Sequence, residues 1–266
     1  MINTDINLTN DEFMLFKTLV YENIGISLNE KAKDILKNKL SRKLRQYKIS
    51  SYGEYYNFIM SDDKYKKEML NIITTNETYF FRENRQFVFL EEEIFPLFKN
   101  KQVNIWSAAS SMGAEAYTIA MIAQNLNLKY KVLGSDINSN VILKANQGVY
   151  PLRWLDKIPS NLQNKYCEVN HEVLVNEFLI SDCLKENTEF KVLNLMHHQN
   201  IGMFDIIFLR NVLIYFNMEV KSQVLSNIVK NLNVGGYLFI SVTEHIDNLD
   251  ITNLEQISSS IFRKVA

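Results

Sequence analysis

The sequence has little of what marks a secreted, a membrane-spanning or a zinc-binding protein. Only two of its 266 residues are cysteines, Cys167 and Cys183, and it opens with MINTD rather than with a charged and then apolar leader. These features predict a location in the reducing cytoplasm. No apolar run approaches the roughly 18 residues that a membrane-spanning helix needs, and no Cys/His spacing is typical of a zinc site. We therefore expect no membrane insertion and no metal.

The sequence also lacks a dominant charge and an obvious catalytic histidine. The formal net charge is −1, which gives no global reason to expect nucleic acid, so an electrostatic partner must meet a local patch. None of the four histidines is next to a candidate nucleophile in sequence, and we interpret them as surface or loop residues. A hydrophobic content of 47% is enough for a full core in one large domain, or in one domain plus a smaller one.

Apolar residues recur with helical spacing from residue 11 to about 70. The pattern predicts a small helical domain over residues 1–73, with a fourth helix over 65–73. Gly25 to Glu30 separates the first helix from the second, and Ser27 or Asn29 is the expected cap. Residues 74–101 are expected to form a linker followed by a cofactor-contacting helix over 85–97. The repeating apolar positions are Phe13, Phe16, Leu19 and Val20, then Ile35, Leu36, Leu40, Leu44 and Tyr47, then Tyr55, Tyr56, Ile59 and Met60.

Short apolar runs alternate with helical ones from about residue 102. We expect strands at 103–106, 131–136, 204–209 and 237–240, helices at 116–125, 138–146 and 218–232, and a turn at 233–236. This alternation predicts an α/β domain over 102–266, with a doubly wound, mostly parallel sheet that binds ligands at the carboxyl ends of its strands. Residues 150–189 keep neither period. We expect a small hairpin insert there, over about 160–185, with 168–175 as the candidate hairpin.

Small and polar residues follow the expected strands at the edge where ligands bind. The loop 107–115 has a single glycine, Gly113, and lacks G-x-G-x-x-G, which favours a nucleoside ligand over a dinucleotide. Asp136 ends the next strand about 20 residues further on, where a carboxylate can accept hydrogen bonds from ribose hydroxyls. The alternative role for Asp136 is a helix cap ahead of Asn138.

Polar residues also follow the later strands. Arg210, Asn211 and Tyr215 come just past the run 204–209, and a charged residue there needs a partner. The alternative for Arg210 is a structural pair with an acidic helix residue. Asn194 and Leu195 follow the run 190–193, where they could meet an adenine edge.

The segment 74–83, TTNETYFFRE, is not explained by packing alone. Asn76 and Thr78 are short hydrogen-bonding side chains, Phe80 and Phe81 anchor the backbone, and Arg82 supplies a cationic fork suited to a carboxylate. The alternative is an N-cap cluster for the helix that follows.

Together these segments resemble the chemotaxis receptor methyltransferase family. Residues 75–83, TNETYFFRE, are similar to the family's TNxTxFFRE signature, 106–113, WSAASSMG, to its WSAAxSxG loop, and 209–216, LRNVLIYF, to its xRNVxIYF element. The order and spacing extend the similarity from about residue 11 to the carboxyl end. The resemblance implies a Rossmann-like methyltransferase domain that uses S-adenosylmethionine, releases S-adenosylhomocysteine and methylates glutamate side chains of chemoreceptors for chemotactic adaptation.

The resemblance also implies the site residues. Asp136 is expected to hold the ribose, and Arg82 and Tyr215 are the expected catalytic residues nearest the reacting methyl. The expected cofactor residues are Asn76, Thr78, Arg82, Glu115, Asp136, Asn194, Leu195, Arg210 and Tyr215, with Asn211 at the same strand end.

The sequence departs from the family pattern in two places. Residues 113–117, GAEAY, replace the usual Gly-Glu-Glu-Pro-Tyr, so that one carboxylate and the proline are lost while Glu115 is retained. Residues 166–181 contain no glycine, whereas members that grip a receptor's carboxyl-terminal pentapeptide carry a glycine-containing turn there. We therefore expect a pentapeptide-independent enzyme.

The proposed chemistry needs no histidine. A glutamate carboxylate, with an unperturbed pKa of about 4.3, is already ionised at neutral pH and can attack a sulfonium methyl without a general base. Alignment and exclusion of water are then what the protein must supply.

The second expected helix carries a basic face that includes Lys39, Arg42, Lys43 and Arg45, which an acidic chemoreceptor helical bundle would attract. A solvated face is the alternative. We expect a monomer with no nucleic-acid partner. The other functions considered are a methyltransferase of another substrate, a non-catalytic S-adenosylmethionine-sensing module and a nicotinamide dehydrogenase.

Overall fold

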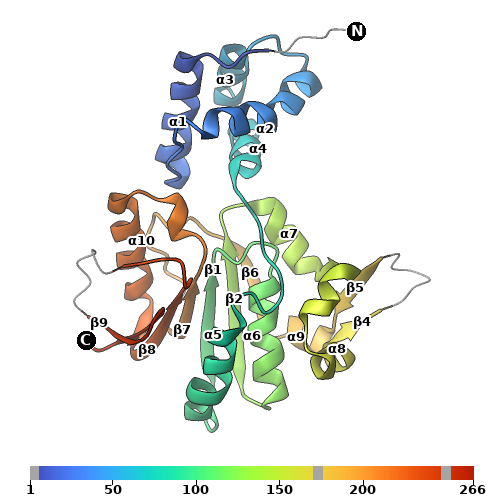
Figure 1. Ribbon diagram of the computed structural model, residues 1–266, viewed down its shortest axis with the longest axis vertical. Helices are drawn as coiled ribbons and strands as arrows, with labels where there is room; N and C mark the ends of the chain where they lie inside the picture. The colour runs from blue at the N-terminus through green and yellow to red at the C-terminus, as the bar shows by residue number, and fades with distance from the viewer. Residues whose placement is uncertain (1–5, 170–175, 247–252) are drawn as a thin grey trace. The chain divides into compact units, whose positions relative to one another are not determined.

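The computed structural model describes residues 6–169, 176–246 and 253–266, and these fall into two compact units (Figure 1). The first unit holds the chain up to Thr75 together with Tyr215–Val220. The second holds Asn76–Ile214 and Lys221–Ala266. Within the described ranges, no helix is both long enough and apolar enough to cross a membrane.

The first unit is the expected helical domain. Its helices are α1 (Asn10–Ile24), α2 (Ala32–Tyr47), α3 (Tyr52–Met60) and α4 (Asp63–Ile73). Thr9 and Glu12 form a capping box that starts α1, and Gly25, with a φ of 72°, ends it in the left-handed conformation. Of the two expected caps of α2, Asn29 contributes a side chain, whose Oδ1 accepts the Ala32 N–H at 3.1 Å.

Residues 215–220 pack with the helical unit although they are distant from it in sequence. Ile26 and Phe216 form an antiparallel bridge, and the Ser27 N–H donates to the Tyr215 carbonyl at 2.9 Å. The Tyr21 hydroxyl accepts a hydrogen bond from Asn217 Nδ2 at 3.0 Å. The chain therefore returns to the helical unit within the third motif, residues 209–216.

The second unit contains a seven-stranded sheet in the order β6-β2-β1-β7-β8-β10-β9. The first five strands in this order are parallel, and β10 is antiparallel to both of its neighbours. The strands are β1 (Val103–Ala108), β2 (Tyr130–Asp136), β6 (Thr188–Val192), β7 (Phe204–Leu209), β8 (Leu232–Ile240), β9 (Leu254–Ser258) and β10 (Ile261–Lys264). The expected mostly parallel α/β sheet is thereby confirmed.

Helices pack on this sheet through apolar faces. They are α5 (Asn84–Phe89), α6 (Ala114–Asn125), α7 (Ser139–Gln147) and α10 (Met218–Lys230). Figure 1 shows α5 and α6 in front of β1 and β2, and the fully buried Ile105, Ile119 and Phe208 belong to the core cluster that joins these layers. Because β1, β2 and β7 are parallel, their carboxyl ends meet at one edge, and the loops that follow them meet there too.

Two local expectations were wrong. The expected helix over 85–97 changes type: α5 is followed by a π-helix, η1 (Leu90–Ile94), and a 3₁₀ helix, η2 (Phe95–Phe98), with Pro96 in the first turn of the latter. The expected turn over 233–236 lies inside β8. Gly235 has a φ of 80° there, and the register against β7 shifts between Phe204 and Ile206, so the glycine pair marks an irregular strand rather than its start.

A small antiparallel sheet forms the accessory insert, with β5 (Glu177–Ile180) between β3 (Val149–Pro151) and β4 (Cys167–Glu168). It is accompanied by η3 (Leu152–Lys157), α8 (Ser160–Tyr166) and α9 (Asp182–Lys185). Its first strand precedes the expected insert of about 160–185. Most of the expected hairpin over 168–175 lies outside the described residues, as does His171.

Candidate functional site

The loop between β1 and α6 has an unusual backbone conformation. Ala109 and Ser111 have φ angles of 60° and 50°, and Gly113 has one of 87°. A Cβ atom on Gly113 would lie 2.8 Å from Phe190 Cζ, so the position needs glycine for space as well as for its conformation. Non-glycine residues at positive φ are costly and cluster at functional sites, which marks this loop as a ligand-binding candidate.

Asp136, at the end of β2, connects this loop to the next one. Its Oδ2 accepts the Ser111 N–H at 2.9 Å and its Oδ1 accepts the Asn138 N–H at 2.9 Å. Burial raises the pKa of Asp136, although the hydrogen bonds from the backbone of Asn138, Ser111 and Ile137 partly offset this effect. The helix-cap role belongs to Asn138, whose side chain accepts the Asn140 N–H. A carboxylate has about four acceptor positions, so Asp136 can hold both loops and still accept from a ligand.

The segment before α5 lies against the same loop. The Asn76 carbonyl accepts a hydrogen bond from Ser111 Oγ at 3.1 Å. Phe80 is fully buried, and its ring meets that of Tyr150 edge-on at 4.9 Å. This anchor fixes the backbone on which Thr78, half-buried, is carried.

Arg82 itself is only partly buried. Its Nη1 donates to the Glu77 carbonyl at 2.8 Å, and its guanidinium lies 5.8 Å from the Tyr79 ring centroid. Phe81 and Glu83 on either side have φ angles of 56° and 58°. For a bulky aromatic residue such a φ is a genuine outlier. The backbone is therefore strained on both sides of Arg82.

Arg210, just past β7, is buried between two carboxylates. Its Nη1 donates to Glu115 Oε2 at 3.1 Å, and its Nη2 lies 3.3 Å from Glu83 Oε2. Nη2 also donates to the Arg82 carbonyl at 2.5 Å, and the guanidinium lies 5.1 Å from the Phe87 ring centroid. Arg210 therefore makes the structural pair that was the alternative to a direct cofactor contact.

The two carboxylates respond differently to this environment. Burial would raise the pKa of Glu83, but the hydrogen bond from Asn211 and the charge of Arg210 outweigh it and lower the pKa. Burial raises the pKa of Glu115, despite the opposing effects of Arg210 and of the hydrogen bond from Ser107. Ser107 Oγ donates to Glu115 Oε1 at 2.7 Å.

Asn211 is held by three residues whose roles the sequence analysis missed. Its Nδ2 donates to Glu83 Oε1 at 3.0 Å and to Ser241 Oγ at 2.8 Å, and its N–H donates to Glu244 Oε2 at 3.1 Å. Asn211 has a φ of 58°, a conformation that Asn tolerates better than most residues. Both side-chain amide hydrogens of Asn211 are used within the protein, so this side chain stabilises the network around Arg210. An acidic residue four positions after a buried strand was the only sequence signal for Glu244.

The turn that contains Asn194 and Leu195 lies beside Asp136. The Leu193 N–H donates to the Asp136 carbonyl at 3.0 Å, and Asn194 Oδ1 accepts the Met196 N–H at 3.1 Å. Leu195 is buried, and its carbonyl accepts from Asn227 of α10 at 3.2 Å.

The structure thus brings Asn76, the β1–α6 loop, Asp136 and the 193–195 turn together along one hydrogen-bonded edge. A second network joins Arg82, Glu83, Glu115, Arg210 and Asn211. Within the described part of the chain, Ser110 Oγ in the same loop is buried without a hydrogen-bond partner. An orphaned hydroxyl beside a strained loop is what a polar ligand would satisfy. Tyr215 is assigned to the helical unit.

The basic residues expected to dock a partner differ in what they contact. Lys39 Nζ donates to the Ile73 and Thr74 carbonyls at 2.8 and 3.1 Å, and burial lowers its pKa. Lys43 pairs with Glu68. Both lysines therefore hold α2 against α4, and of the four expected residues only Arg42 and Arg45 are exposed.

Comparisons with known proteins agree with these features. Residues 76–262 match the family described as the CheR methyltransferase SAM-binding domain, and residues 11–74 match the CheR methyltransferase all-alpha domain. The chemotaxis protein methyltransferase of Borreliella burgdorferi is 34% identical over 279 residues, covering 98% of this chain and 97% of that protein. The one from Escherichia coli K12 is 33% identical over 254 residues, covering 91% and 87%. This chain belongs to the CheR family of chemotaxis protein methyltransferases.

Proposed function

We propose that the protein transfers the methyl group of S-adenosylmethionine to glutamate side chains of chemoreceptors and forms their methyl esters. The observation that carries this proposal is the hydrogen-bonded edge built around Asp136, which supplies a nucleoside site within a family of chemotaxis methyltransferases. When bound, S-adenosylmethionine supplies an electrophilic methyl group, and S-adenosylhomocysteine is the product.

Different residues of this edge contact different parts of the cofactor in the proposed complex. Asp136 accepts hydrogen bonds from the ribose hydroxyls with the acceptor positions that Ser111 and Asn138 leave open. Asn194 and Leu195 border the adenine, because their turn is hydrogen-bonded to the Asp136 carbonyl through Leu193. Asn76 and Thr78 line the same side.

Arg82 is the proposed cation at the reacting end. Its guanidinium has five N–H donors in a fixed fork, one of which is used by the Glu77 carbonyl. The remaining donors suit the carboxylate of the cofactor or of the incoming glutamate. Glu115 and Arg210 act on Arg82 indirectly, because Arg210 holds the Arg82 carbonyl and Glu115 neutralises Arg210. Asn211 supports the same network.

Tyr215 is the second proposed catalytic residue, with its hydroxyl orienting the acceptor carboxylate. Its backbone carbonyl is fixed by the Ser27 N–H, so the helical unit restrains this tyrosine. A carboxylate nucleophile needs no general base at neutral pH. The protein's contribution is then alignment of the carboxylate and exclusion of water.

The proposed partner is the acidic helical bundle of a chemoreceptor, docked on the exposed Arg42 and Arg45 of α2. Lys39 and Lys43 contribute by holding the helix rather than by direct contact. We further propose that docking does not require a receptor pentapeptide and that the protein acts as a monomer.

Incubation with methyl-labelled S-adenosylmethionine and membranes containing chemoreceptors tests this function. We expect base-labile label on the receptor, and an equal amount of Asp136→Ala protein should give far less. Cofactor binding without receptor labelling would instead indicate a non-catalytic sensing module. Base-stable label would indicate a different acceptor atom.

A further inference from the structure

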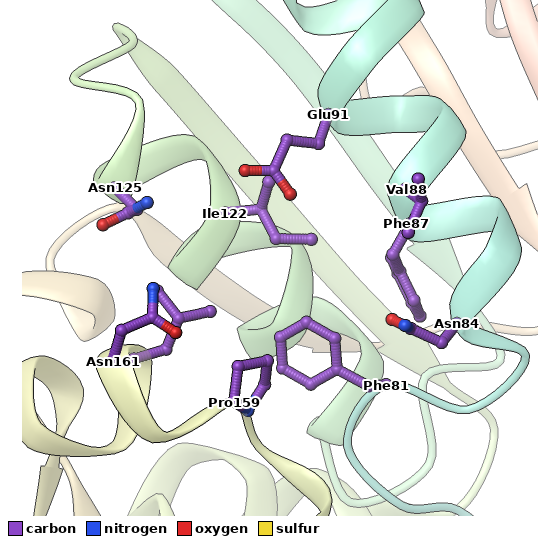
Figure 2. A pocket seen from close by; sticks show the side chains of 10 residues that line it. Phe81, Asn84, Phe87, Val88, Glu91, Ile122, Asn125, Pro159 and Asn161 are labelled. Atoms are coloured by element: carbon purple, nitrogen blue, oxygen red, sulfur yellow. The ribbon is translucent and has the colours of Figure 1, made fainter.

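A cavity of about 220 Å³ lies in the second unit between α5, η1, α6 and α8 (Figure 2). Its lining combines two aromatic rings, aliphatic side chains, three amides and a single carboxylate. The lining residues are Phe81, Asn84, Phe87, Val88, Glu91, Ile122, Asn125, Pro159, Asn161 and Leu162. None of them is among the proposed cofactor residues, so the cavity is not part of the site described above.

Glu91 is the only charged residue of this lining. It comes from the π-helix η1, and Figure 2 shows its carboxylate reaching toward Ile122 on the opposite wall. The side chain is half-buried, and it has neither an ion pair nor a hydrogen bond among the residues that the structure describes. An unpaired carboxylate beside apolar surface attracts a cation more strongly than one fully surrounded by water.

The aromatic walls suit a cation as well. The Phe81 and Phe87 rings meet edge-on with centroids 5.9 Å apart. Phe87 already has the guanidinium of Arg210 5.1 Å from its ring centroid, and Phe81 is only partly buried. A cation within about 6 Å of such a ring is attracted by its quadrupole.

Amide groups complete the lining. The side chains of Asn84 and Asn161 make no hydrogen bond within the described ranges, so their amide oxygens can accept from an N–H donor. Asn125 is partly engaged, since its Oδ1 accepts from Lys165 at 2.7 Å. Ile122 and Leu162 supply the apolar surface for a hydrocarbon stem.

We propose that this cavity binds a primary ammonium group on a short apolar stem. Glu91 neutralises the ammonium, the face of Phe81 attracts it, and Ile122 and Leu162 cover the stem. The volume of about 220 Å³ lies below the roughly 300–1,000 Å³ of sites for drug-sized ligands, which fits a stem of a few carbons. The same chemistry occurs in a free alkylamine and in a lysine side chain of a bound protein.

Methyl NMR of the full chain, labelled at isoleucine and leucine methyl groups, tests the proposal and separates the two sources. One arm titrates n-butylamine, and the other titrates Nα-acetyl-lysine-N-methylamide, which has the same ammonium and stem attached to peptide groups. We expect saturable shifts of the Ile122 and Leu162 methyls, with a dissociation constant on the order of millimolar. Tighter binding of the lysine amide would identify a protein side chain, and tighter binding of butylamine a free amine.

Charge dependence is tested by two neighbouring variants. Glu91→Gln should weaken binding roughly five-fold, the size expected for a partly exposed ion pair. Glu92→Gln, on the same π-helix but outside the lining, should leave it unchanged. The uncharged 1-butanol should bind more weakly than butylamine. The proposal is overturned if neither amine gives saturable shifts at these methyls, or if Glu91→Gln binds as well as the unmodified protein.

Discussion

At the scale of single residues, the Glu83 carboxylate has more hydrogen-bond and ion-pair partners than its position in the sequence suggests. Its carboxylate accepts hydrogen bonds from Asn211, Ser241 and the Val242 N–H, and it pairs with Arg210. These partners are between 127 and 159 residues away, since 210 − 83 is 127 and the Val242 bond spans 159. No local pattern contains such a pairing, which is why no role for Glu83 was predicted even though it ends the most distinctive motif.

We expect Glu83→Gln to lower the free energy of unfolding at pH 7 by about 2–3 kcal/mol, because Arg210 loses one of its two buried counter-charges. The pKa of Glu83 is lowered in the folded protein. Its contribution is therefore present above the unfolded value, near 4.5, and is lost as pH falls through the folded value.

The measurement is denaturant unfolding of both proteins at pH 7 and at several pH values below 4.5. The difference between the two proteins should shrink on acidification. Glu115 also titrates, and because the charge of Glu83 is one of the effects that raise its pKa, Glu115 contributes to the difference between the two proteins. A difference that stayed constant down to acid unfolding would mean that the charge of Glu83 contributes nothing.

Asp136 shows what sequence reasoning can and cannot predict for a site residue. Its place at a strand end follows from the apolar run before it, and the structure has β2 end at this residue. Its hydrogen bond with the Ser111 N–H does not follow from the sequence, because it depends on the positive φ of Ser111.

We expect Asp136→Ala to weaken S-adenosylmethionine binding by roughly 1.5–3 kcal/mol, the value of charge-assisted hydrogen bonds. Titration calorimetry measures the loss. Asp182→Ala is the matched control, because that aspartate is largely exposed and pairs with Lys185 across one helical turn. Equal dissociation constants for the folded Asp136→Ala protein and the unmodified one would remove Asp136 from the site.

At the scale of elements, the sequence predicts best where burial alone decides the structure. The strand expected at 204–209 has the observed bounds of β7, because its apolar run is buried in the sheet and marks both ends of the strand. Residues 84–98 were harder, because α, π and 3₁₀ turns have similar local preferences and packing selects among them. The different roles of the basic residues in α2 were also not predictable from the sequence. Lys39 and Lys43 look like surface lysines until α4 is placed beside them.

These different roles lead to a paired prediction for α2. Arg42→Glu with Arg45→Glu should slow receptor methylation and leave cofactor affinity unchanged, because both side chains are exposed. Stability should fall by less than about 1 kcal/mol, since Arg45 lies in the last turn of α2. Lys43→Glu should instead destabilise the helical unit by about 1–2 kcal/mol, because it places two carboxylates where Lys43 and Glu68 now pair. Methylation rates at low and high salt, together with thermal melting, separate the two effects. A wild-type methylation rate for the double arginine variant at low salt would leave the solvated-face interpretation standing.

At the scale of the whole molecule, the two compact units do not simply follow the order of the sequence. The helical pattern predicts the first unit up to about residue 73, but residues 215–220 join it through contacts to Tyr21, Ile26 and Ser27. Such a return of the chain leaves no periodic signal. As a result, the last two residues of the third motif, Tyr215 and Phe216, pack with the helical unit.

S-adenosylmethionine should protect the second unit selectively. A ligand that binds only the folded state stabilises it by about 2.7 kcal/mol when its concentration is 100 times the dissociation constant. We expect slower hydrogen exchange in β1, β2 and α6 and a smaller change in α1 to α4, as measured by mass spectrometry with and without cofactor. The Asp136→Ala protein should lose this protection at the same cofactor concentration. Uniform protection of all helices would show that the nucleoside site is not confined to the second unit.

Arg82 and Tyr215 are the two residues proposed to act on the methyl transfer itself. Tyr215→Phe removes one hydroxyl and keeps the ring, so the fold should hold and the turnover rate should fall more than cofactor affinity, because an aligning group acts chiefly in the transition state. Arg82→Ala should reduce both, since it removes the cation next to a substrate carboxylate. Single-turnover methyl transfer at saturating cofactor, together with titration calorimetry, distinguishes these outcomes. An unchanged chemical rate in Tyr215→Phe would make the hydroxyl structural, and normal affinity and rate in Arg82→Ala would overturn the role assigned to the TNETYFFRE segment.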